Sequence, residues 1–419
     1  MSLPLQLDYS QSISELPECT NYEVTIVPST GAGSYAAGSV IKFDLQQRGF
    51  IDPTSLVVRY KYALACAING EMIATPAYTP FLRLETLIGS QVVESINQYN
   101  QVAGFLYVNT QMDVAMKYGQ QSALGFNGNS TISSLELLDG RLCTLNENGF
   151  FSMPLVGLLS SSAKLIPAFA MPQISVQLTM DAVTNMLTAN VVPTGFVISN
   201  IELCYNMLDF GRSVEHDILA MPKLFLKCWS FSNSSASISS GTSGSISLVY
   251  NQKYASVKAA YILPTGNAAA SINKWGDSFD LTTNNGDYSI MIAGQCYPQR
   301  AISTLNNKAY VIQELRRASG NINDKNNNLS INAIEFNYLP TTGTTYSTPS
   351  KFIIGIPLEK LHIPSDKAIL TGVSTNNSNI TVNINTGTAT SQAYTVNLIL
   401  NYDAIIEIDT QTRDARVRQ

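Results

Sequence analysis

The sequence predicts an all-β protein made of two similar antiparallel sandwiches in tandem. Three observations predict this fold: a phrase that occurs twice about 200 residues apart, period-2 apolar alternation along most of the chain, and polar turns between the alternating segments. Short alternating strands that follow one another closely form antiparallel sheets, whereas a parallel sheet needs a crossover helix between its strands. We therefore expect about eight short antiparallel strands and one short helix in each half.

The repeated phrase is an apolar stretch that runs into Pro-Leu-x-x-Leu. Its copies cover residues 150–158 and 353–361, and each half has two further matches, first a period-2 strand and then a segment near its end. The matched residues are Ile174, Val176 and Leu178 with Ile380, Val382 and Ile384, and Ile201, Leu203 and Tyr205 with Leu398, Leu400 and Tyr402. The offset drifts from 203 to 206 to 197 residues, as loop insertions between related elements would produce. Because proline is tolerated at the end of a strand and not inside a central one, each copy should enter a loop at equivalent places.

The first half reads as strands separated by turns. Gly and Ser residues at 31–38 indicate a hairpin turn, Asn69-Gly70 is a strong turn signal, and Gly89 marks a bend in a long alternating segment. The expected strands are 22–27, 39–45, 55–64, 81–96, 150–156, 173–180 and 196–209. Between them, apolar residues spaced loosely as in a helix run from Val102 to Met116, and Gly119 bounds them.

The second half repeats this organisation. A Ser/Gly-rich stretch joins its first two strands, and Asn285-Gly286 is a turn. The expected strands are 223–231, 245–250, 256–263, 288–298, 331–338, 351–357, 379–384 and 393–408, with a helix at 305–318 that ends near Gly320. Residues 212–221 follow neither period, so we place the domain boundary there.

These elements divide the chain into five parts. We expect an N-terminal arm, a first sandwich, a linker, a second sandwich and a C-terminal tail, at residues 1–20, 21–212, 213–222, 223–409 and 410–419. Each sandwich then has roughly 200 residues, which is within the range of one all-β domain.

Composition excludes several classes of protein. Hydrophobic residues make up 45% of the chain but charged residues only 13%, well below the roughly 25% of an average globular protein. A surface rich in Ser, Thr, Asn and Gln suits a protein that contacts copies of itself, although a soluble sandwich with polar loops has the same composition. The net charge of −5 argues against sequence-specific or wrapping contact with nucleic acid, which needs clustered Lys and Arg.

Targeting signals and disulfides are not expected. The chain has no run of about 18 apolar residues that would cross a membrane. Its N-terminus lacks the basic start and continuous apolar core of a secretory signal. The six cysteines, at 19, 66, 143, 204, 228 and 296, are widely spaced, so we expect free thiols that are mostly buried.

No pattern predicts an active site, a metal site or a cofactor site. His216 lies between Glu215 and Asp217, but adjacent residues point in different directions and no second ligand has the right spacing, so we interpret it as a solvated linker histidine. His362 is interpreted as a packed or rim histidine. Hydrolase, dinucleotide and phosphate-loop motifs are absent from the sequence.

Carboxylates and aromatic residues leave weaker alternatives open. A glycosidase needs two carboxyl groups on opposite sides of a bond, and the candidates are Asp277, Asp280, Asp287 and Glu314. The Asn/Asp-rich segments near 280–287 and 323–328 lack the alternate carboxylates and terminal Glu of a calcium loop. Trp229 and Trp275 could line a sugar groove, but packing in a core or interface is the favoured interpretation.

Three segments carry a resemblance to a known family. Residues 83–100, residues 153–168 and residues 397–408 resemble the double jelly-roll major capsid proteins of the adenovirus lineage of DNA viruses, of the polinton-like virus and virophage type. The resemblance spans nearly the whole chain and implies that each sandwich is an eight-stranded jelly roll. The chain is short for that family, which implies small outer loops.

The resemblance implies a structural role without catalysis or cofactors. It implies a homotrimer that imitates a hexagon and tiles an icosahedral shell around double-stranded DNA. Implied partners are neighbouring capsomers, penton and minor capsid proteins, and an internal membrane, and the implied location is the virion, with assembly inside the host cell. The two terminal arms would then order only on assembly. The alternatives are a receptor- or glycan-binding sandwich and, third, a sandwich hydrolase.

Overall fold

The computed structural model describes most of the chain. The described residues are 19–31, 33–66, 70–71, 77–110, 142–143, 147–185, 193–266, 278–281, 286–303, 308–320, 329, 331, 336, 351–360 and 370–419. Within these ranges the strands form four larger antiparallel sheets and one two-stranded pair, β6 (Gly70–Glu71) with β9 (Leu142–Cys143). The all-β prediction is therefore confirmed.

Two of the sheets lie in the first half of the chain. The larger contains β1 (Thr20–Ile26), β2 (Ser34–Tyr35), β4 (Phe50–Ile51), β5 (Val57–Cys66), β10 (Glu147–Pro154), β11 (Ile166–Pro167) and β13 (Pro193–Asp209). The smaller contains β3 (Val40–Asp44), β12 (Ile174–Met180), β7 (Phe81–Ile88) and β8 (Gln91–Asn97) in this spatial order. Tyr60 of β5 and Phe81 of β7 meet edge to face with ring centroids 5.5 Å apart, so the two sheets pack across a common core.

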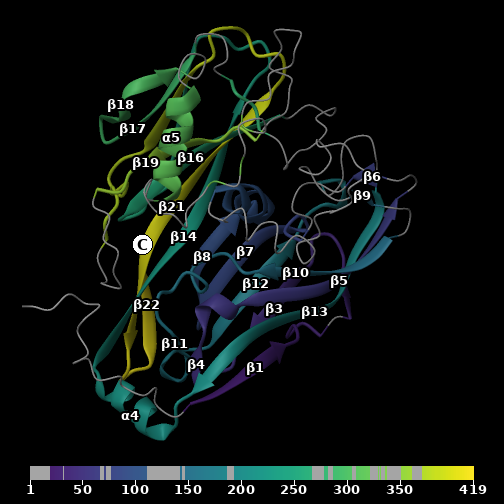
Figure 1. Ribbon diagram of the computed structural model, residues 1–419, viewed down its shortest axis with the longest axis vertical. Coiled ribbons are helices and arrows are strands. Elements are labelled where there is room, and N and C mark those ends of the chain that lie inside the picture. The colour runs from purple at the N-terminus through teal and green to yellow at the C-terminus, as the bar shows by residue number, and fades with distance from the viewer. Residues whose placement is uncertain are drawn as a thin grey trace, which may run out of the picture.

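The other two sheets lie in the second half. The larger contains β14 (Lys223–Ile238), β21 (Tyr394–Asp409), β16 (Val257–Gly266) and β19 (Ile354–Pro357), with β22 (Asp414–Arg418) added to β21. The smaller runs β15 (Ser245–Tyr250), β20 (Ile380–Asn385), β17 (Asp287–Ile292) and β18 (Gln295–Ser303). The Tyr250 hydroxyl of β15 donates a 2.9 Å hydrogen bond to the Val396 carbonyl of β21, which ties these sheets together. Figure 1 shows the two sandwiches side by side.

The helices bounded within the described residues are short and lie between strands. They are η2 (Pro53–Ser55), η3 (Asn100–Tyr107), α1 (Val108–Thr110), η4 (Ala168–Ala170), η5 (Val183–Asn185), α4 (Arg212–Ala220) and α5 (Lys308–Ser319). The helix expected from Val102 begins as the π-helix η3, and its expected end at Met116 lies outside the described residues. The helix expected at 305–318 is confirmed as α5. The strand expected at 331–338 lies mostly outside the described residues, and Phe336, which is described, has helical backbone.

The residues expected to form an irregular linker are a helix instead. α4 follows Gly211, whose φ of 81° lets the chain turn sharply after β13, and none of its residues is buried. This helix has only nine residues, which give the helical period little more than two turns in which to appear, so the pattern did not predict it. It joins the last strand of the first sandwich to the first strand of the second.

The repeated phrase occupies equivalent strands in the two sandwiches. Pro154 is the last residue of β10 and pairs with Val57 of β5, and Pro357 is the last residue of β19 and pairs with Ala259 of β16. Both prolines therefore end a strand, where the missing amide hydrogen removes no central ladder bond. The next residue, leucine in both copies, is buried.

The other two matches lie in the same register. In each larger sheet, one residue of a central strand, β5 or β16, pairs on one side with a residue of the repeated phrase. On its other side it pairs with a residue of the last match, which lies in β13 or β21. The equivalent rows are Met153, Val58 and Leu203 in the first half and Ile356, Ala260 and Leu400 in the second. In the smaller sheets, Ile174 pairs with Ile88 and Ile380 pairs with Ile292. The repeat is therefore a repeat of architecture, and its changing offset reflects loops of different length.

The C-terminal tail differs from the arm expected at 410–419. It is β22, which turns back after β21 and pairs with its last five residues. In the first half β4 pairs with Leu208 of β13, and the equivalent residue of β21, Ile405, pairs with Arg418 of β22. The tail thus takes the place of β4 in the second sandwich, because an unpaired strand end leaves backbone groups without partners. Of the expected N-terminal arm, residues 1–18 lie outside the described residues and Thr20 begins β1.

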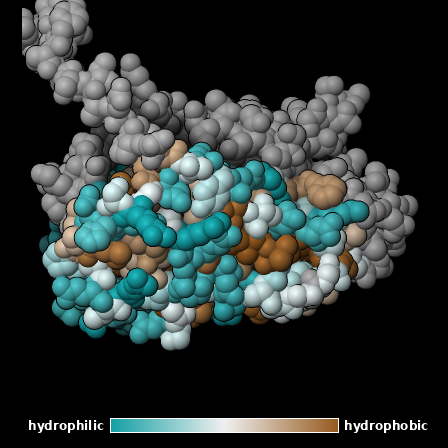
Figure 2. All heavy atoms as spheres, turned by 90° about the horizontal axis from the view of Figure 1, so that it is seen from below, coloured by the Kyte–Doolittle hydropathy of each residue, from teal (hydrophilic) through white to brown (hydrophobic). Residues whose placement is uncertain are grey.

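The described surface is polar rather than charged. Figure 2 shows a lower face that is mostly hydrophilic, with apolar side chains gathered near its middle. Exposed large apolar residues include Val27, Met221 and Phe225. Among the described residues, no helix is long and apolar enough to span a membrane.

Candidate functional site at the junction of the two sandwiches

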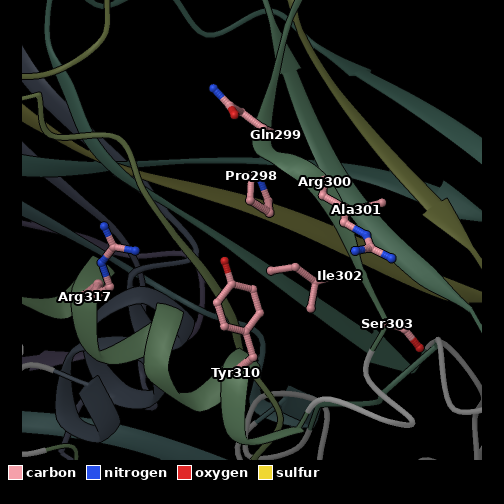
Figure 3. Close-up of a pocket in the computed structure, with 8 residues that line it drawn as sticks. All are labelled: Pro298, Gln299, Arg300, Ala301, Ile302, Ser303, Tyr310 and Arg317. Carbon is pink, nitrogen blue, oxygen red and sulfur yellow. The ribbon is translucent and has the colours of Figure 1, made fainter.

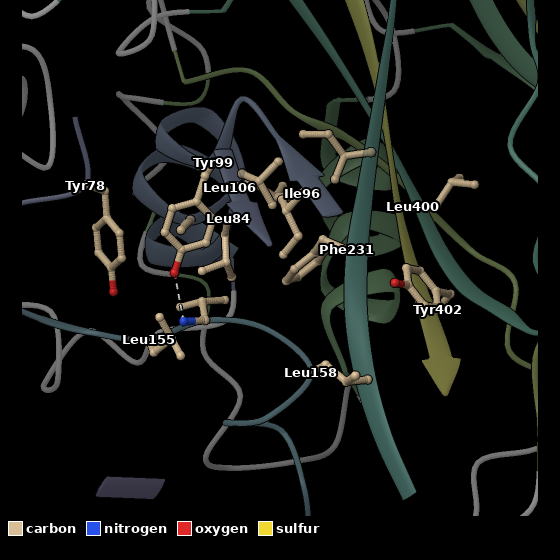
Figure 4. Packing of buried hydrophobic residues seen from close by; sticks show 14 of the residues in the cluster. Tyr78, Leu84, Ile96, Tyr99, Leu106, Leu155, Leu158, Phe231, Leu400 and Tyr402 are labelled. Carbon is tan, nitrogen blue, oxygen red and sulfur yellow. Dashed lines mark hydrogen bonds between the residues drawn. The ribbon is translucent and has the colours of Figure 1, made fainter. Parts of the chain in front are cut away.

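The two sandwiches meet where β8 of the first lies against β14 of the second. Figure 4 shows Phe231 pointing from β14 toward Ile96 of β8, with Leu400 and Tyr402 on the other side of β14. All four side chains belong to one continuous hydrophobic cluster. The sandwiches are therefore joined by core-like packing, as in an obligate interface.

A buried carboxylate lies at the centre of this junction. Glu94 of β8 is 3% exposed, and its side chain accepts hydrogen bonds from the Thr86 hydroxyl at 2.6 Å and the Leu158 amide at 2.7 Å. The Ser230 hydroxyl of β14 donates a further hydrogen bond from the second sandwich. Because both sandwiches contribute donors, Glu94 fixes how they are placed relative to each other.

Burial shifts the ionisation of this group. Removal from water raises the pKa of Glu94, while the hydrogen bonds from Ser230, Thr86 and the Leu158 amide lower it, and burial dominates. The folded protein therefore holds the Glu94 proton at pH values where the unfolded chain has lost it.

This shift predicts a pH dependence that Glu94→Gln should remove. A raised folded-state pKa makes the contribution of Glu94 to the free energy of unfolding greatest below the unfolded pKa of about 4.3 and smaller as pH rises through the folded pKa. Gln has the same shape and does not ionise. We expect the variant to lose less stability than the parent between pH 4 and pH 8, measured by urea unfolding. Glu215→Gln on the exposed helix α4 is the control, and equal pH profiles for all three proteins would contradict the prediction.

Backbone groups on the edge of β14 also form hydrogen bonds with the first sandwich. The Trp229 amide donates to the Ser161 hydroxyl at 2.8 Å, and that hydroxyl donates to the Trp229 carbonyl at 2.6 Å. The Trp229 ring stacks on Tyr107 of η3 with centroids 6.3 Å apart. The favoured interpretation of Trp229, packing in a core or interface, is consistent with this position, whereas Trp275 lies outside the described residues.

Side-chain amides form two further sets of hydrogen bonds across the junction. The Asn233 side chain donates to Gln98 Oε1 at 2.7 Å and to the Asn97 carbonyl at 3.5 Å. The side chain of Gln419, the last residue, donates to the Val93 carbonyl of β8. The C-terminal strand thus helps to hold the two sandwiches together.

The second sandwich carries a pocket at its outer end. It has a volume of about 710 Å³ and lies between β18 and α5, with Arg300 and Ser303 on the strand and Tyr310 and Arg317 on the helix. Figure 3 shows Tyr310 reaching up from the helix toward Pro298 and Ile302. Two arginines make this a cationic surface, although Arg317 also binds Glu314 at 2.8 Å.

The histidine candidates form no site in the described structure. His216 and Asp217 are exposed on α4, and Glu215 is only partly buried. The described residues contain no group of three or more His, Cys, Asp or Glu side chains that could hold a metal ion. His362 lies outside the described residues.

The carboxylate candidates are partly brought together. Burial raises the pKa of Tyr288, and the nearby charges of Glu314 and Asp280 raise it further, so both carboxylates lie close to this tyrosine. Glu314 is buried and forms an ion pair with Arg317. Asp287 is the first residue of β17. Asp277 lies outside the described residues. An ion-paired carboxylate beside a buried tyrosine is a packing arrangement rather than an open groove with two facing acids.

The four cysteines whose side chains the structure describes are free thiols. Cys204 and Cys228 are buried, Cys19 is partly buried and Cys296 is exposed. Burial raises the pKa of Cys228 to about 12, so this thiol is inert at neutral pH.

Sequence reasoning missed the junction itself, although β8 contains a signal. Ile96 faces the core, so the period-2 rule places Glu94 on the same side. A charged residue at an inward position of a strand indicates a buried polar contact. The pattern did not show that the contact would be with the other sandwich.

Comparisons with known proteins give relatives of fold but not of sequence. No family model and no curated protein matches the chain. Among solved structures, VP54 of PBCV-1, fitted into a reconstruction of the virophage Sputnik, has a TM-score of 0.67 at 10% identity and covers 98% of this chain and 99% of that one. The Faustovirus major capsid protein has a TM-score of 0.65 at 10% identity, covering 96% and 92% of the two chains. The mavirus major capsid protein has a TM-score of 0.56 at 10% identity, covering 100% and 95%.

These comparisons define the fold. The chain has the double jelly-roll fold of these viral capsid proteins over nearly its whole length. The predicted fold class is therefore confirmed, and the count of eight strands in each roll stays a prediction.

Proposed function

We propose that the protein is a structural major capsid protein that assembles with copies of itself into the shell of an icosahedral virus. The observation that carries this proposal is the register of the repeat: equivalent strands of the two sandwiches carry the same phrase at the same pairing positions. Two similar sandwiches in one chain offer two similar footprints to neighbours, which suits a shell subunit. The location that follows is the virion.

The finer organisation belongs to the same proposal. We propose a homotrimer in which six sandwiches imitate a hexagon, so that trimers tile a shell around double-stranded DNA without gaps. The same proposal divides the chain into a first roll at 21–212, a linker at 213–222 and a second roll at 223–409, to which β22 adds a strand. Penton proteins, minor capsid proteins and an internal membrane are further proposed partners. The segment proposed to order on assembly is the part of the N-terminal arm that precedes β1.

Sizing of the purified chain tests this function. We expect a stable trimer by light scattering at working dilution, and sheets or particles by electron microscopy at raised concentration. A receptor-binding module would instead bind a glycan or cell surface saturably without tiling. A monodisperse monomer that forms no larger assembly at any concentration would contradict the capsid proposal.

A further inference from the structure

We infer that β18 and α5 of one copy dock on β1 of the next copy, in the way that β8 and η3 dock on β14 within each chain. This inference rests on the proposed self-assembly and specifies its seam. It follows from the internal repeat, which makes the junction inside the chain a template for the contact between chains.

β8 and β18 occupy equivalent places in the two sandwiches. Each is the last strand of the smaller sheet in its sandwich and follows a two-residue turn, so that Gln91 pairs with Ile88 and Gln295 pairs with Ile292. Farther along, Ile96 and Ile302 are both buried and precede Asn97 and Ser303. A helix follows each strand, η3 in the first sandwich and α5 in the second.

β1 and β14 are equivalent strands as well. Leu203 of β13 pairs with Ile26, and the equivalent Leu400 of β21 pairs with Ser232. This register places Glu23 at the position of Trp229 and Val27 at the position of Asn233. β1 is therefore the surface that would receive the neighbour, as β14 receives β8.

β1 and β18 each lie at the edge of a sheet. Among the described residues, β1 pairs only with β13 and β18 pairs only with β17, so each strand has one free edge. Val27 is 67% exposed, although the equivalent Asn233 is buried in the junction. Figure 1 shows β1 and β18 at opposite ends of the molecule, with the β8–β14 junction between them. An unpaired edge leaves room for a neighbouring chain to pack against it, as β8 packs against β14 without pairing with it as a strand.

The two surfaces have complementary charge. Glu23 is half exposed and is paired with Arg59 at 3.1 Å in the free chain. The surface that would face it carries Arg300 and Arg317 of the pocket between β18 and α5. In the contact between chains, an acidic and a basic side chain thus take the places of the stacked aromatic pair. Their opposite charges favour docking of β1 on the surface of β18 and α5 over other pairings.

The geometry of this contact limits the size of the assembly. A head-to-tail contact joins two different surfaces, so it forms a ring when the rotation closes. If the contact between chains repeats the contact inside the chain, three copies use the same geometry six times. The closed ring leaves no β1 or β18 edge free.

Engineered cysteines test the seam. Asn233 reaches the Asn97 carbonyl at 3.5 Å inside the chain, and the equivalent pair between chains is Val27 with Ser303. We expect Val27→Cys/Ser303→Cys, made in a Cys296→Ser background, to form a covalent trimer on mild oxidation, seen on a non-reducing gel. Asn97→Cys/Asn233→Cys should cross-link within the chain and keep the monomer mass. Val249→Cys/Ser303→Cys is the negative control, because Val249 is 60% exposed on β15, which belongs to a different sheet from β1.

The outcomes separate the seam from the function. A covalent trimer that needs both cysteines supports the seam. If the parent is a trimer by light scattering and the Asn97/Asn233 control cross-links, but Val27 and Ser303 do not, the seam is wrong and self-assembly stands. A monomeric parent overturns both.

Discussion

Leu155→Asp should leave the protein unable to fold, and Leu358→Asp should have the same effect. These leucines follow the prolines of the repeated phrase and are 4% and 3% exposed in the core. An unpaired carboxylate in such a place costs several kcal/mol. Since a domain is stable by only about 5–15 kcal/mol, either change removes much of the folding free energy. We expect insoluble protein, or soluble protein that lacks a cooperative unfolding transition by circular dichroism.

The matched control is Phe150→Asp. Phe150 is the first residue of the same copy of the phrase but is 68% exposed, so its replacement should change the free energy of unfolding by only about 0.5 kcal/mol. Soluble trimers from Leu155→Asp or Leu358→Asp would show that the phrase does not form core. A control as damaging as the core variants would show that the strand is sensitive for another reason.

The fold could be predicted because its signals are local. Alternation over five to eight residues is enough to predict a half-buried strand. The repeated phrase added the tandem arrangement, since its prolines end β10 and β19 at equivalent positions. Short-range patterns of this kind do not depend on which sheet a strand joins.

The junction could not be predicted because it depends on contacts between distant segments. The Ser230 hydroxyl reaches Glu94 across 136 positions, and no local pattern encodes that pairing. The C-terminal strand does have a local signal, because Ala415 and Val417 alternate with arginines as in a half-buried strand. The same arginines fit a solvated chain end, and this was the interpretation of residues 410–419. A strand of five residues at a terminus becomes stable only when β21 supplies its partner.

Gly355→Val should separate helix α5 from the second sandwich and prevent trimer formation. Gly355 of β19 lies beneath the helix: an added Cβ would stand 2.9 Å from the Leu315 Cα and 3.1 Å from the Ala318 Cβ. A backbone atom cannot move aside as a flexible side chain does, so the helix must shift. We expect a loss of about 3 kcal/mol in the free energy of unfolding, measured in urea.

The repeat explains why glycine is needed in only one copy of the phrase. The equivalent residue of the first copy is Ser152, which is partly exposed, whereas α5 packs directly on β19 in the second and receives a 2.9 Å hydrogen bond from Tyr261 to the Ala318 carbonyl. Because α5 forms half of the proposed seam, Gly355→Val should also yield monomers at concentrations where the chain still folds. Gly33→Val is the control, since a Cβ there meets nothing within 4 Å, and it should remain a trimer of parental stability. Parental stability and a trimer from Gly355→Val would mean that the helix does not depend on this contact.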